Sequence, residues 1–293
     1  MFLAADQMRK KIASNMESLI SMDIAEEYKE VFKNWLENKD NGELSKVHSR
    51  EVEAILAENN IENEEAKVLV EEIKERADFL VKRSQWIFGG DGWAYDIGYN
   101  GIDHVLANKE NVNILVLDTE VYSNTGGQSS KSTRTGAVAK FAAAGKQTAK
   151  KDLTKIALTY EHVYVGTISL GANPNQAIKV LKEAEAYNGP SIIVAYAPCI
   201  AQGIIKGMKN SINEEKSATE VGYFPLFHYN PASLEFRLDS KADFSKYEEF
   251  ILGEDRYRSL KKLNKNAKEL LDKNKENAIK RYKYYESLAN REE

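Results

Sequence analysis

Two stretches of this sequence each combine a buried β-strand pattern with a turn that is rich in glycines and side-chain oxygens. In the first, residues 86–98, an apolar strand ends in a Gly-Asp-Gly turn and a helix pattern follows at once. In the second, residues 112–127, an apolar run ends in Asp-Thr-Glu and reaches two glycines a few residues later. A strand that passes directly into a helix is typical of an α/β sheet. These two stretches constrain the fold more than any other feature of the chain.

Two further strand patterns continue this alternation. The run 162–167 precedes Asn173 and Pro174, a pair that is typical of an N-cap and the first position of a helix. A helix with a buried stripe follows, and the run 191–196 supplies a fourth strand. Strands and helices that alternate at this spacing predict an α/β fold with a parallel sheet.

The patterns divide the chain into three predicted regions. Residues 1–83 carry apolar residues at helical spacing, and we expect these helices to pack on the sheet, although a docking surface for neighbouring domains fits the same pattern. Residues 84–231 form the α/β domain. Residues 232–293 form an arm with an edge strand and a rather basic amphipathic helix. A solvated charged face explains that helix better than a binding site for an acidic electron carrier.

Composition excludes several classes of function. The chain has 293 residues and a net charge of −4, so nothing indicates binding to nucleic acid or to an anionic membrane. No apolar run approaches the roughly 18 residues of a membrane span, and the first residues lack the apolar core of a secretory signal. We therefore expect a cytoplasmic protein. The single cysteine, Cys199, excludes an intramolecular disulfide and any multi-cysteine metal site built from this chain alone.

The two strand ends predict a ligand site. Ligands of parallel sheets bind beyond the carboxyl ends of the strands, where Asp91 and Thr119 should lie. A carboxylate beside a hydroxyl and a main-chain carbonyl suits Mg²⁺, which prefers hard oxygen ligands and often shares a phosphate. A dinucleotide fingerprint fails because Tyr95 stands where it needs glycine. We predict a diphosphate with its metal, while a plain turn at Gly-Asp-Gly is the alternative.

The loop after the second strand could contribute to such a site. It is rich in Gly, Ser, Thr and Lys as far as Lys151, and its one longer apolar run, residues 137–144, predicts a short helix. Side chains such as Ser130 and Lys131 could donate hydrogen bonds to a phosphate or could simply face solvent.

The same residues carry a resemblance to a known family. Gly90, Asp91 and Gly92, followed 28 residues after Asp91 by Thr119, resemble the thiamine diphosphate motif of thiamine enzymes. The stretches 90–98, 118–128 and 136–146 are more specific, and they resemble the C-terminal thiamine domain of pyruvate:ferredoxin (flavodoxin) oxidoreductases. The similarity extends from about the N-terminal helices to about Pro231.

The resemblance implies a role for each site residue. Asp91, the Thr119 hydroxyl and the Val121 carbonyl would hold Mg²⁺, and Asn124 would face the thiazolium and the substrate as the catalytic residue. Most thiamine enzymes have Asn in place of Thr119, a departure that this oxidoreductase family shares. The remaining residues of the implied cofactor site are Gly90, Gly92 and Trp93.

Cys199 follows the fourth strand directly. A lone cysteine is usually a small buried apolar residue. The resemblance, however, implies that it supplies the fourth ligand of a [4Fe–4S] cluster near the thiamine. The other three ligands lie upstream of the region that this chain covers, so we expect the cluster only in a longer polypeptide.

The implied activity is the oxidative decarboxylation of pyruvate to acetyl-CoA, with electrons passed singly through iron–sulfur clusters to ferredoxin or flavodoxin. The implied partners are pyruvate, coenzyme A, the electron carrier, a pyrimidine-binding domain that carries the activating glutamate, and a second copy in a homodimer. We find no second thiamine-type domain in the 293 residues, so we expect the chain alone to be inactive. Three alternatives stay open: a thiamine domain specific for another 2-oxoacid, such as indolepyruvate or 2-oxoglutarate, a non-catalytic assembly domain that binds Mg²⁺-diphosphate, and an α/β scaffold without a ligand.

Overall fold

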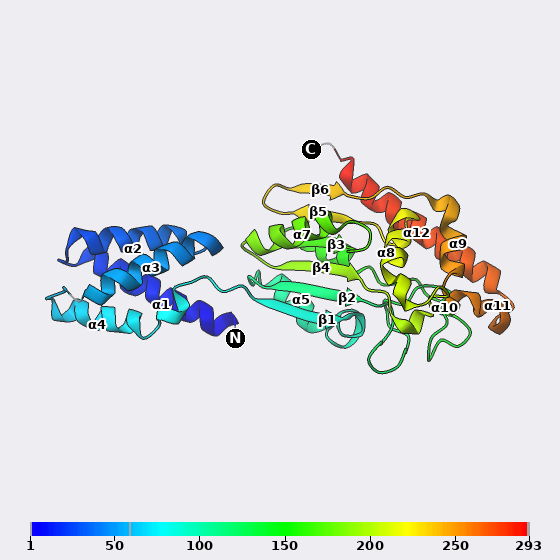
Figure 1. Cartoon of the computed structure of the whole chain (residues 1–293), viewed down its shortest axis with the longest axis horizontal. Helices are drawn as coiled ribbons and strands as arrows, with labels where there is room; N and C mark the ends of the chain where they lie inside the picture. Colours follow the sequence, from blue (N-terminus) through cyan, green and yellow to red (C-terminus); the bar gives the residue numbers. More distant parts are fainter. Residues whose placement is uncertain (1, 59, 292–293) are drawn as a thin grey trace. The chain divides into compact units, whose positions relative to one another are not determined.

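The computed structural model describes residues 2–58 and 60–291, so residues 1, 59, 292 and 293 of the predicted outer regions lie outside the described residues (Figure 1). The chain divides into two compact units, Met1–Gln85 and Trp86–Glu293. Each unit is described by itself below.

The first unit is a helical bundle with its own apolar core. Its helices are α1 (Phe2–Ser21), α2 (Glu26–Asn38), α3 (Gly42–Glu58) and α4 (Glu64–Lys74), and a short 3₁₀ turn follows at Ala77–Phe79. The apolar stripes of these helices pack against one another, and their fully buried members include Ile12, Met16, Leu19, Phe32, Trp35, Val52 and Ile73. The stripes thus have partners inside this unit, and the packing of the region on the sheet stays a prediction.

The second unit is built on a mixed sheet. Within the described residues the sheet has six strands: β1 (Trp86–Gly90), β2 (Asn113–Asp118), β3 (Tyr164–Ile168), β4 (Ser191–Tyr196), β5 (Phe227–Asn230) and β6 (Glu235–Leu238). Their order is β1-β2-β4-β3-β5-β6. The first four strands in this order are parallel, as predicted, but β5 and β6 are antiparallel. The predicted α/β class is confirmed, and the sheet is parallel only as far as β3.

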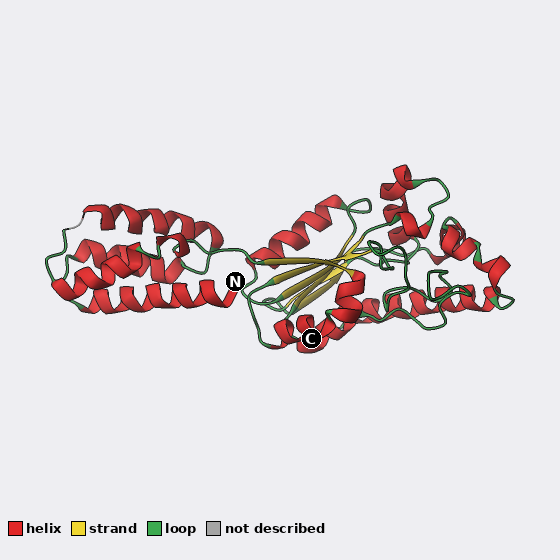
Figure 2. Ribbon diagram, turned by 90° about the horizontal axis from the view of Figure 1, so that it is seen from below, coloured by secondary structure: helices red, strands yellow, loops and turns green. Residues whose placement is uncertain are grey.

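Helices cover both faces of this sheet (Figure 2). On one face α7 (Pro174–Ala186) packs on β3 and β4, with Val180 against Tyr164 and Ile193. On the other face α12 (Ala267–Ala289) stacks Tyr285 on Phe227 with ring centroids 4.2 Å apart. The remaining helices are α5 (Tyr99–Ala107), α6 (Leu153–Ala157), α8 (Ser211–Glu220), α9 (Tyr247–Leu252), α10 (Asp255–Arg258) and α11 (Leu260–Leu263). Among the described residues, no helix is both long and apolar enough to cross a bilayer.

The C-terminal segment belongs to the same compact unit as the sheet. Strand β6, which the sequence predicts as an edge strand, pairs with β5 along residues 235–238. Because α12 also packs on this sheet, the predicted boundary between residues 231 and 232 falls inside the unit.

The loop between β2 and α6 differs from the prediction. Residues 119–151 are all described and hold no helix, so the short helix predicted over 137–144 is wrong. Phe141, inside this run, has a positive φ of 64°, and Gly136 and Gly145, which flank the run, have 80° and 83°, whereas an α-helix has no residue with positive φ. The N–H of Val138 donates instead to the carbonyl of Arg256 at 2.8 Å. The backbone of the run thus bonds to Arg256, to Gly127 and to a turn of its own at residues 139–142, and not in the pattern of a helix.

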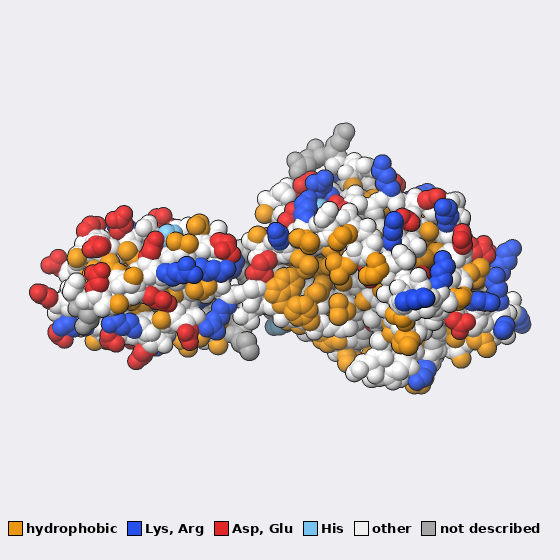
Figure 3. Space-filling model, in the orientation of Figure 1, with side chains coloured by type: hydrophobic (Ala, Val, Ile, Leu, Met, Phe, Trp, Pro, Cys, Tyr) orange, Lys and Arg blue, Asp and Glu red, His pale blue; other side chains and the backbone are white. Residues whose placement is uncertain are grey.

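Strands β1 and β2 leave an apolar surface on one face of the second unit. Phe88 is 66% exposed and Leu117 is 44% exposed. Phe88 pairs with Leu115, and Gly90 pairs with Leu117, so these side chains share one face of the sheet. Figure 3 shows hydrophobic side chains gathered over this part of the unit. Exposed apolar patches of this kind mark surfaces that contact other proteins or domains.

Candidate functional site

The loops after β1, β2 and β4 meet beyond the carboxyl ends of these strands. Thr119, in the loop after β2, donates a hydrogen bond to Asp91 at 2.8 Å. Its backbone carbonyl accepts a hydrogen bond from the side-chain amide of Gln202, after β4, at 3.1 Å. This edge of the sheet is where parallel α/β proteins bind their ligands.

The three oxygen atoms of the predicted metal site lie together, with the Thr119 hydroxyl between the other two. This oxygen lies 2.8 Å from Asp91 Oδ1 and 2.9 Å from the carbonyl oxygen of Val121. The hydroxyl has a single hydrogen, so it cannot serve both acceptors fully. One carboxylate, one hydroxyl and one carbonyl fit Mg²⁺, which would take its other ligands from phosphate and water. The predicted set contains one carboxylate only. Among the described residues, no group of three or more His, Cys, Asp and Glu side chains is suited to a metal ion.

Asp91 is buried at the centre of this arrangement, with 1% of its surface exposed. Its Oδ2 accepts a hydrogen bond from Ser130 at 2.6 Å. This contact brings residues 129–151, called the serine-rich loop below, to the site. Burial and the neighbouring Asp118 charge raise the pKa of Asp91 to about 6, although the Ser130 and Thr119 hydrogen bonds oppose the shift. A carboxyl with this pKa loses its proton easily when a cation arrives at neutral pH.

Two of the three glycines at residues 89–92 are required by close packing. A Cβ atom at Gly92 would overlap the ring of Tyr122, and one at Gly89 would overlap the indole of Trp93. Gly90, in contrast, faces open space. Trp93 itself is half-buried and lies in a single wide helical turn, Gly92–Ile97. The turn therefore keeps a bare backbone surface beside Asp91, which a diphosphate can approach closely.

Asn124 is exposed in a tight turn that spans residues 122–128. The N–H of Tyr122 donates to the carbonyl of Gln128 at 2.9 Å, and that of Gly127 donates to the carbonyl of Tyr122 at 2.8 Å. Gly126 and Gly127 both have positive φ, 109° and 87°, which glycine adopts without strain. These hydrogen bonds fix the backbone of the turn that carries Asn124, the predicted catalytic residue.

Cys199 lies against this same turn. Its Sγ is 2.9 Å from the Ser123 hydroxyl and accepts a hydrogen bond from the N–H of Ala201 at 3.4 Å. The thiol is buried and free of any disulfide. An N–H aimed at sulfur suits a cluster ligand, because such bonds stabilise a bound thiolate. Cys199, the predicted cluster ligand, thus contacts the residue that precedes Asn124 in the chain.

A buried group of charged residues, which no sequence pattern predicted, lies directly behind residues 119–121, called the metal loop below. Glu120 Oε1 accepts from Arg134 Nε at 2.6 Å and from Lys150 Nζ at 3.1 Å, and its Oε2 accepts from Arg256 Nη2 at 2.8 Å. Lys150 also pairs with Asp118. Burial would raise the pKa of Glu120, but the cations of Arg134, Lys150 and Arg256 hold it well below its usual range. The sequence signal was an acidic residue between two predicted metal ligands, at a position that the motif leaves unassigned.

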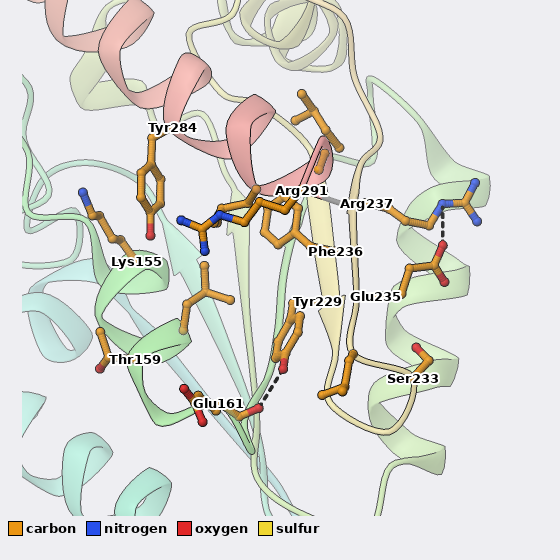
Figure 4. Close-up of a pocket in the computed structure, with 15 residues that line it drawn as sticks. Lys155, Thr159, Glu161, Tyr229, Ser233, Glu235, Phe236, Arg237, Tyr284 and Arg291 are labelled. Carbon is orange, nitrogen blue, oxygen red and sulfur yellow. Dashed lines mark hydrogen bonds and ion pairs between the residues drawn. The ribbon is translucent and has the colours of Figure 1, made fainter. Parts of the chain in front are cut away.

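A separate hollow lies at the opposite end of the sheet (Figure 4). Tyr229 lines it and donates a hydrogen bond to the carbonyl of Glu161 at 3.0 Å. Because Tyr229 pairs with Val165 near the start of β3, this hollow lies at the amino ends of the parallel strands. Its other lining residues include Lys155, Phe236, Arg237, Tyr284 and Arg291, and none of the predicted site residues is among those that line it.

Sequence comparison finds a known family over the segment that contains both strand ends. Residues 76–195 match the family described as thiamine pyrophosphate enzyme, C-terminal TPP binding domain. This range includes both strand ends and the oxygens that converge on Thr119. Residues 76–195 of this chain thus match a thiamine pyrophosphate-binding domain. That domain contains β1 to β3 and nearly all of β4.

The whole chain is also similar to part of the pyruvate oxidoreductases. It is 45% identical over 298 residues to pyruvate-flavodoxin oxidoreductase of Klebsiella pneumoniae, a match that covers 100% of this chain and 25% of the relative. It is 46% identical over 296 residues to pyruvate:ferredoxin oxidoreductase of Moorella thermoacetica, with 99% and 25% covered. It is 42% identical over 275 residues to mitochondrial pyruvate dehydrogenase [NADP(+)] of Euglena gracilis, with 92% and 15% covered. The chain spans a quarter or less of these relatives, and the predicted resemblance is confirmed.

Proposed function

We propose that this chain is the thiamine diphosphate- and Mg²⁺-binding part of a pyruvate:ferredoxin (flavodoxin) oxidoreductase. The observation that carries the proposal is the convergence of Asp91, Thr119 and Val121 oxygens at the strand ends, inside the segment that matches the thiamine family. Hard oxygen ligands at this position suit a cation that is shared with a diphosphate.

The residues of the thiamine domain divide the work as follows. Asp91, Thr119 and Val121 hold the metal, and the bare backbone at Gly90 admits the diphosphate. Gly92 leaves the space that the Tyr122 ring fills beside this turn. Trp93 packs against that turn and keeps its shape. Thiamine diphosphate, when bound, supplies a thiazolium ring that accepts electrons as carbon dioxide leaves a 2-oxoacid.

Asn124 acts on the substrate side of the site. Its amide is exposed and can donate a hydrogen bond to the reacting oxygen of pyruvate. A hydrogen-bond donor aimed at an oxygen that gains charge stabilises the transition state more than the substrate. Cys199, which contacts Ser123, the chain neighbour of Asn124, holds the [4Fe–4S] cluster that takes up the electrons, together with cysteines of a longer polypeptide.

The activity requires further partners. In this proposal, coenzyme A takes the acetyl group. Ferredoxin or flavodoxin takes the electrons, as the names of two relatives suggest. The exposed apolar face at Phe88 and Leu117 supports the packing of a further domain, for which we propose the pyrimidine-binding domain, in an enzyme that forms a homodimer. We propose a cytoplasmic location, although the relative in Euglena gracilis is named as mitochondrial.

Calorimetric titration of the chain with thiamine diphosphate, with and without Mg²⁺, tests the proposal. We expect binding that requires Mg²⁺ and that Asp91→Ala abolishes, because this substitution removes the only carboxylate of the proposed metal site. Asp272→Ala, at an exposed position of α12, is the matched control and should bind as the unsubstituted chain does. Binding that persists in Asp91→Ala would contradict the proposed site.

A further inference from the structure

Glu120 lies between two of the proposed metal-holding residues in a backbone conformation that favours glycine. Its φ is 60°, and its side chain is fully buried. A non-glycine residue in this left-handed region is strained by about 1–3 kcal/mol and persists only when its surroundings hold it there. The rotation at residue 120 sets the direction of the Val121 carbonyl relative to the Thr119 hydroxyl, so this strained residue shapes the metal loop.

The carboxylate of Glu120 is held by side chains from three distant segments. Arg134 and Lys150 come from the serine-rich loop, and Arg256 comes from α10, 136 residues along the chain. Tyr223 donates a further hydrogen bond to Glu120 Oε2.

Arg256 joins the C-terminal segment to two parts of the loop between β2 and α6. Its Nη2 lies 2.8 Å from Glu120 Oε2 and 3.0 Å from the Tyr223 hydroxyl, and its Nε donates to Glu254 at 2.6 Å. Its backbone carbonyl accepts from the N–H of Val138 at 2.8 Å. One buried residue therefore anchors Glu120 and the backbone of the serine-rich loop together.

One nitrogen of the Arg256 side chain lacks a hydrogen-bond partner among the described residues. This atom, Nη1, is buried. An unpaired buried nitrogen lowers stability. Strain at Glu120 and an unpaired nitrogen at Arg256 are therefore both retained where the two residues meet, a combination that is typical of functional sites.

We propose that Arg256 is a positioning residue for the metal loop. By holding Glu120 it keeps the Thr119 hydroxyl and the Val121 carbonyl directed to the point that they share with Asp91, and it thereby sets the Mg²⁺ affinity of the thiamine domain. The metal part of this inference rests on the proposed function. The fixing of the loop does not, because it concerns the chain without ligands.

Four variants of the chain test this role. Arg256→Gln removes both the positive charge and the planar guanidinium group, whereas Arg256→Lys keeps the charge alone. Tyr223→Phe deletes only the hydroxyl that donates to Glu120. Arg258→Gln, at an exposed position of the same helix α10, is the matched control. Each variant is first compared with the unsubstituted chain by circular dichroism and thermal melting.

Two measurements follow. Hydrogen exchange of the backbone amides 119–123, without ligands, should be faster in Arg256→Gln, intermediate in Arg256→Lys and unchanged in Arg258→Gln. Calorimetric Mg²⁺ titration at saturating thiamine diphosphate should show an affinity that is about 10–100-fold weaker in Arg256→Gln, the usual effect of losing a residue that orients a metal ligand. Affinity for thiamine diphosphate at saturating Mg²⁺ should fall less.

The outcomes separate the two proposals. A folded Arg256→Gln with unchanged exchange at 119–123 and unchanged Mg²⁺ affinity overturns the positioning role. If Arg256→Gln does not fold, Tyr223→Phe decides, with faster exchange supporting the role and unchanged exchange overturning it. A third outcome is that the unsubstituted chain binds no Mg²⁺ with thiamine diphosphate, while Arg256→Gln speeds hydrogen exchange at residues 119–123. The proposed function and the metal part of this inference then fail. The role of Arg256 in fixing the loop stands.

Discussion

The helical unit and the strand-end site bury their side chains by opposite means. The core of α1 to α4 is apolar, with Leu19, Phe32 and Trp35 fully covered. Behind the strand ends, the buried groups are charged or polar, and Glu120 and Asp118 are as inaccessible as any leucine. Apolar contacts are tolerant of their exact partner, whereas a buried charge needs its specific counter-charge. The comparison shows which part of the molecule is free to vary and which part is fixed by its chemistry.

The largest effect is expected at Glu120. Glu120→Ala leaves Arg134, Lys150 and Arg256 buried without their shared counter-charge, which should lower the free energy of unfolding by about 3–5 kcal/mol. Urea denaturation followed by circular dichroism measures the change. Glu276→Ala, at an exposed position of α12, is the control and should change little. A loss under about 1 kcal/mol at Glu120 would show that the charged cluster is no more demanding than the apolar core.

A core substitution in the helical unit should cost slightly less and respond differently to shape. Leu19→Ala removes buried methyl groups and should cost about 2–5 kcal/mol, while Leu19→Met should cost under about 1.5 kcal/mol. The near-isosteric Glu120→Gln should, in contrast, retain most of the loss seen in Glu120→Ala, because shape does not replace charge. Equal tolerance of Leu19→Met and Glu120→Gln in urea denaturation would break the comparison.

Asn124 should affect catalysis without affecting stability. It is exposed, so Asn124→Ala should leave the urea midpoint unchanged. In an assembly restored by adding the other domains of a pyruvate oxidoreductase, the substitution should remove about 1–3 kcal/mol of stabilisation of the reacting oxygen. The kcat/KM for pyruvate-dependent reduction of a dye measures this loss. An unchanged kcat/KM would remove Asn124 from the catalytic role.

The last prediction is a pH dependence at Asp91. Its pKa is raised to about 6, above the ordinary value of 3.8, so the folded chain holds this proton more tightly than the unfolded chain. The contribution of Asp91 to stability should therefore decline as pH rises from about 4 to about 6 and then level off. Mg²⁺ affinity should change in the opposite direction, weakening up to about tenfold per unit below pH 6, because the metal needs the ionised carboxylate.

Thermal melting and Mg²⁺ titration between pH 4.5 and 7.5 measure both trends. Asp91→Asn should remove the melting trend that belongs to this group, since the amide does not titrate. An identical pH profile in Asp91→Asn and the unsubstituted chain would show that other groups cause the dependence. The helical unit, with its apolar core, should contribute little to either profile.

Local patterns were sufficient for much of the fold and for part of the site. The strands that end at Gly90 and Asp118 were predicted from apolar runs, and the convergence of Asp91 and Thr119 follows from the geometry of parallel strands. Both inferences depend on neighbouring residues in the sequence, because hydrophobic periodicity and turn chemistry act over a few positions. The roles of these residues toward metal and cofactor stay predictions.

Other features required the three-dimensional structure. The run 137–144 has the composition of a helix, yet its backbone bonds to Arg256 and to other parts of its own loop. The contact between Glu120 and Arg256 joins residues 136 positions apart, and no spacing rule connects them.

The sequence by itself determined the class of fold, the order of its strands and helices along the chain, and the strand-end turns that carry the ligand motif. Only the tertiary structure decided the antiparallel edge of the sheet, the path of the serine-rich loop and the charged cluster behind Glu120. The physical reason is range: periodicity and turn preferences act between near neighbours, whereas burying a charge depends on which distant counter-charge the completed fold brings to it.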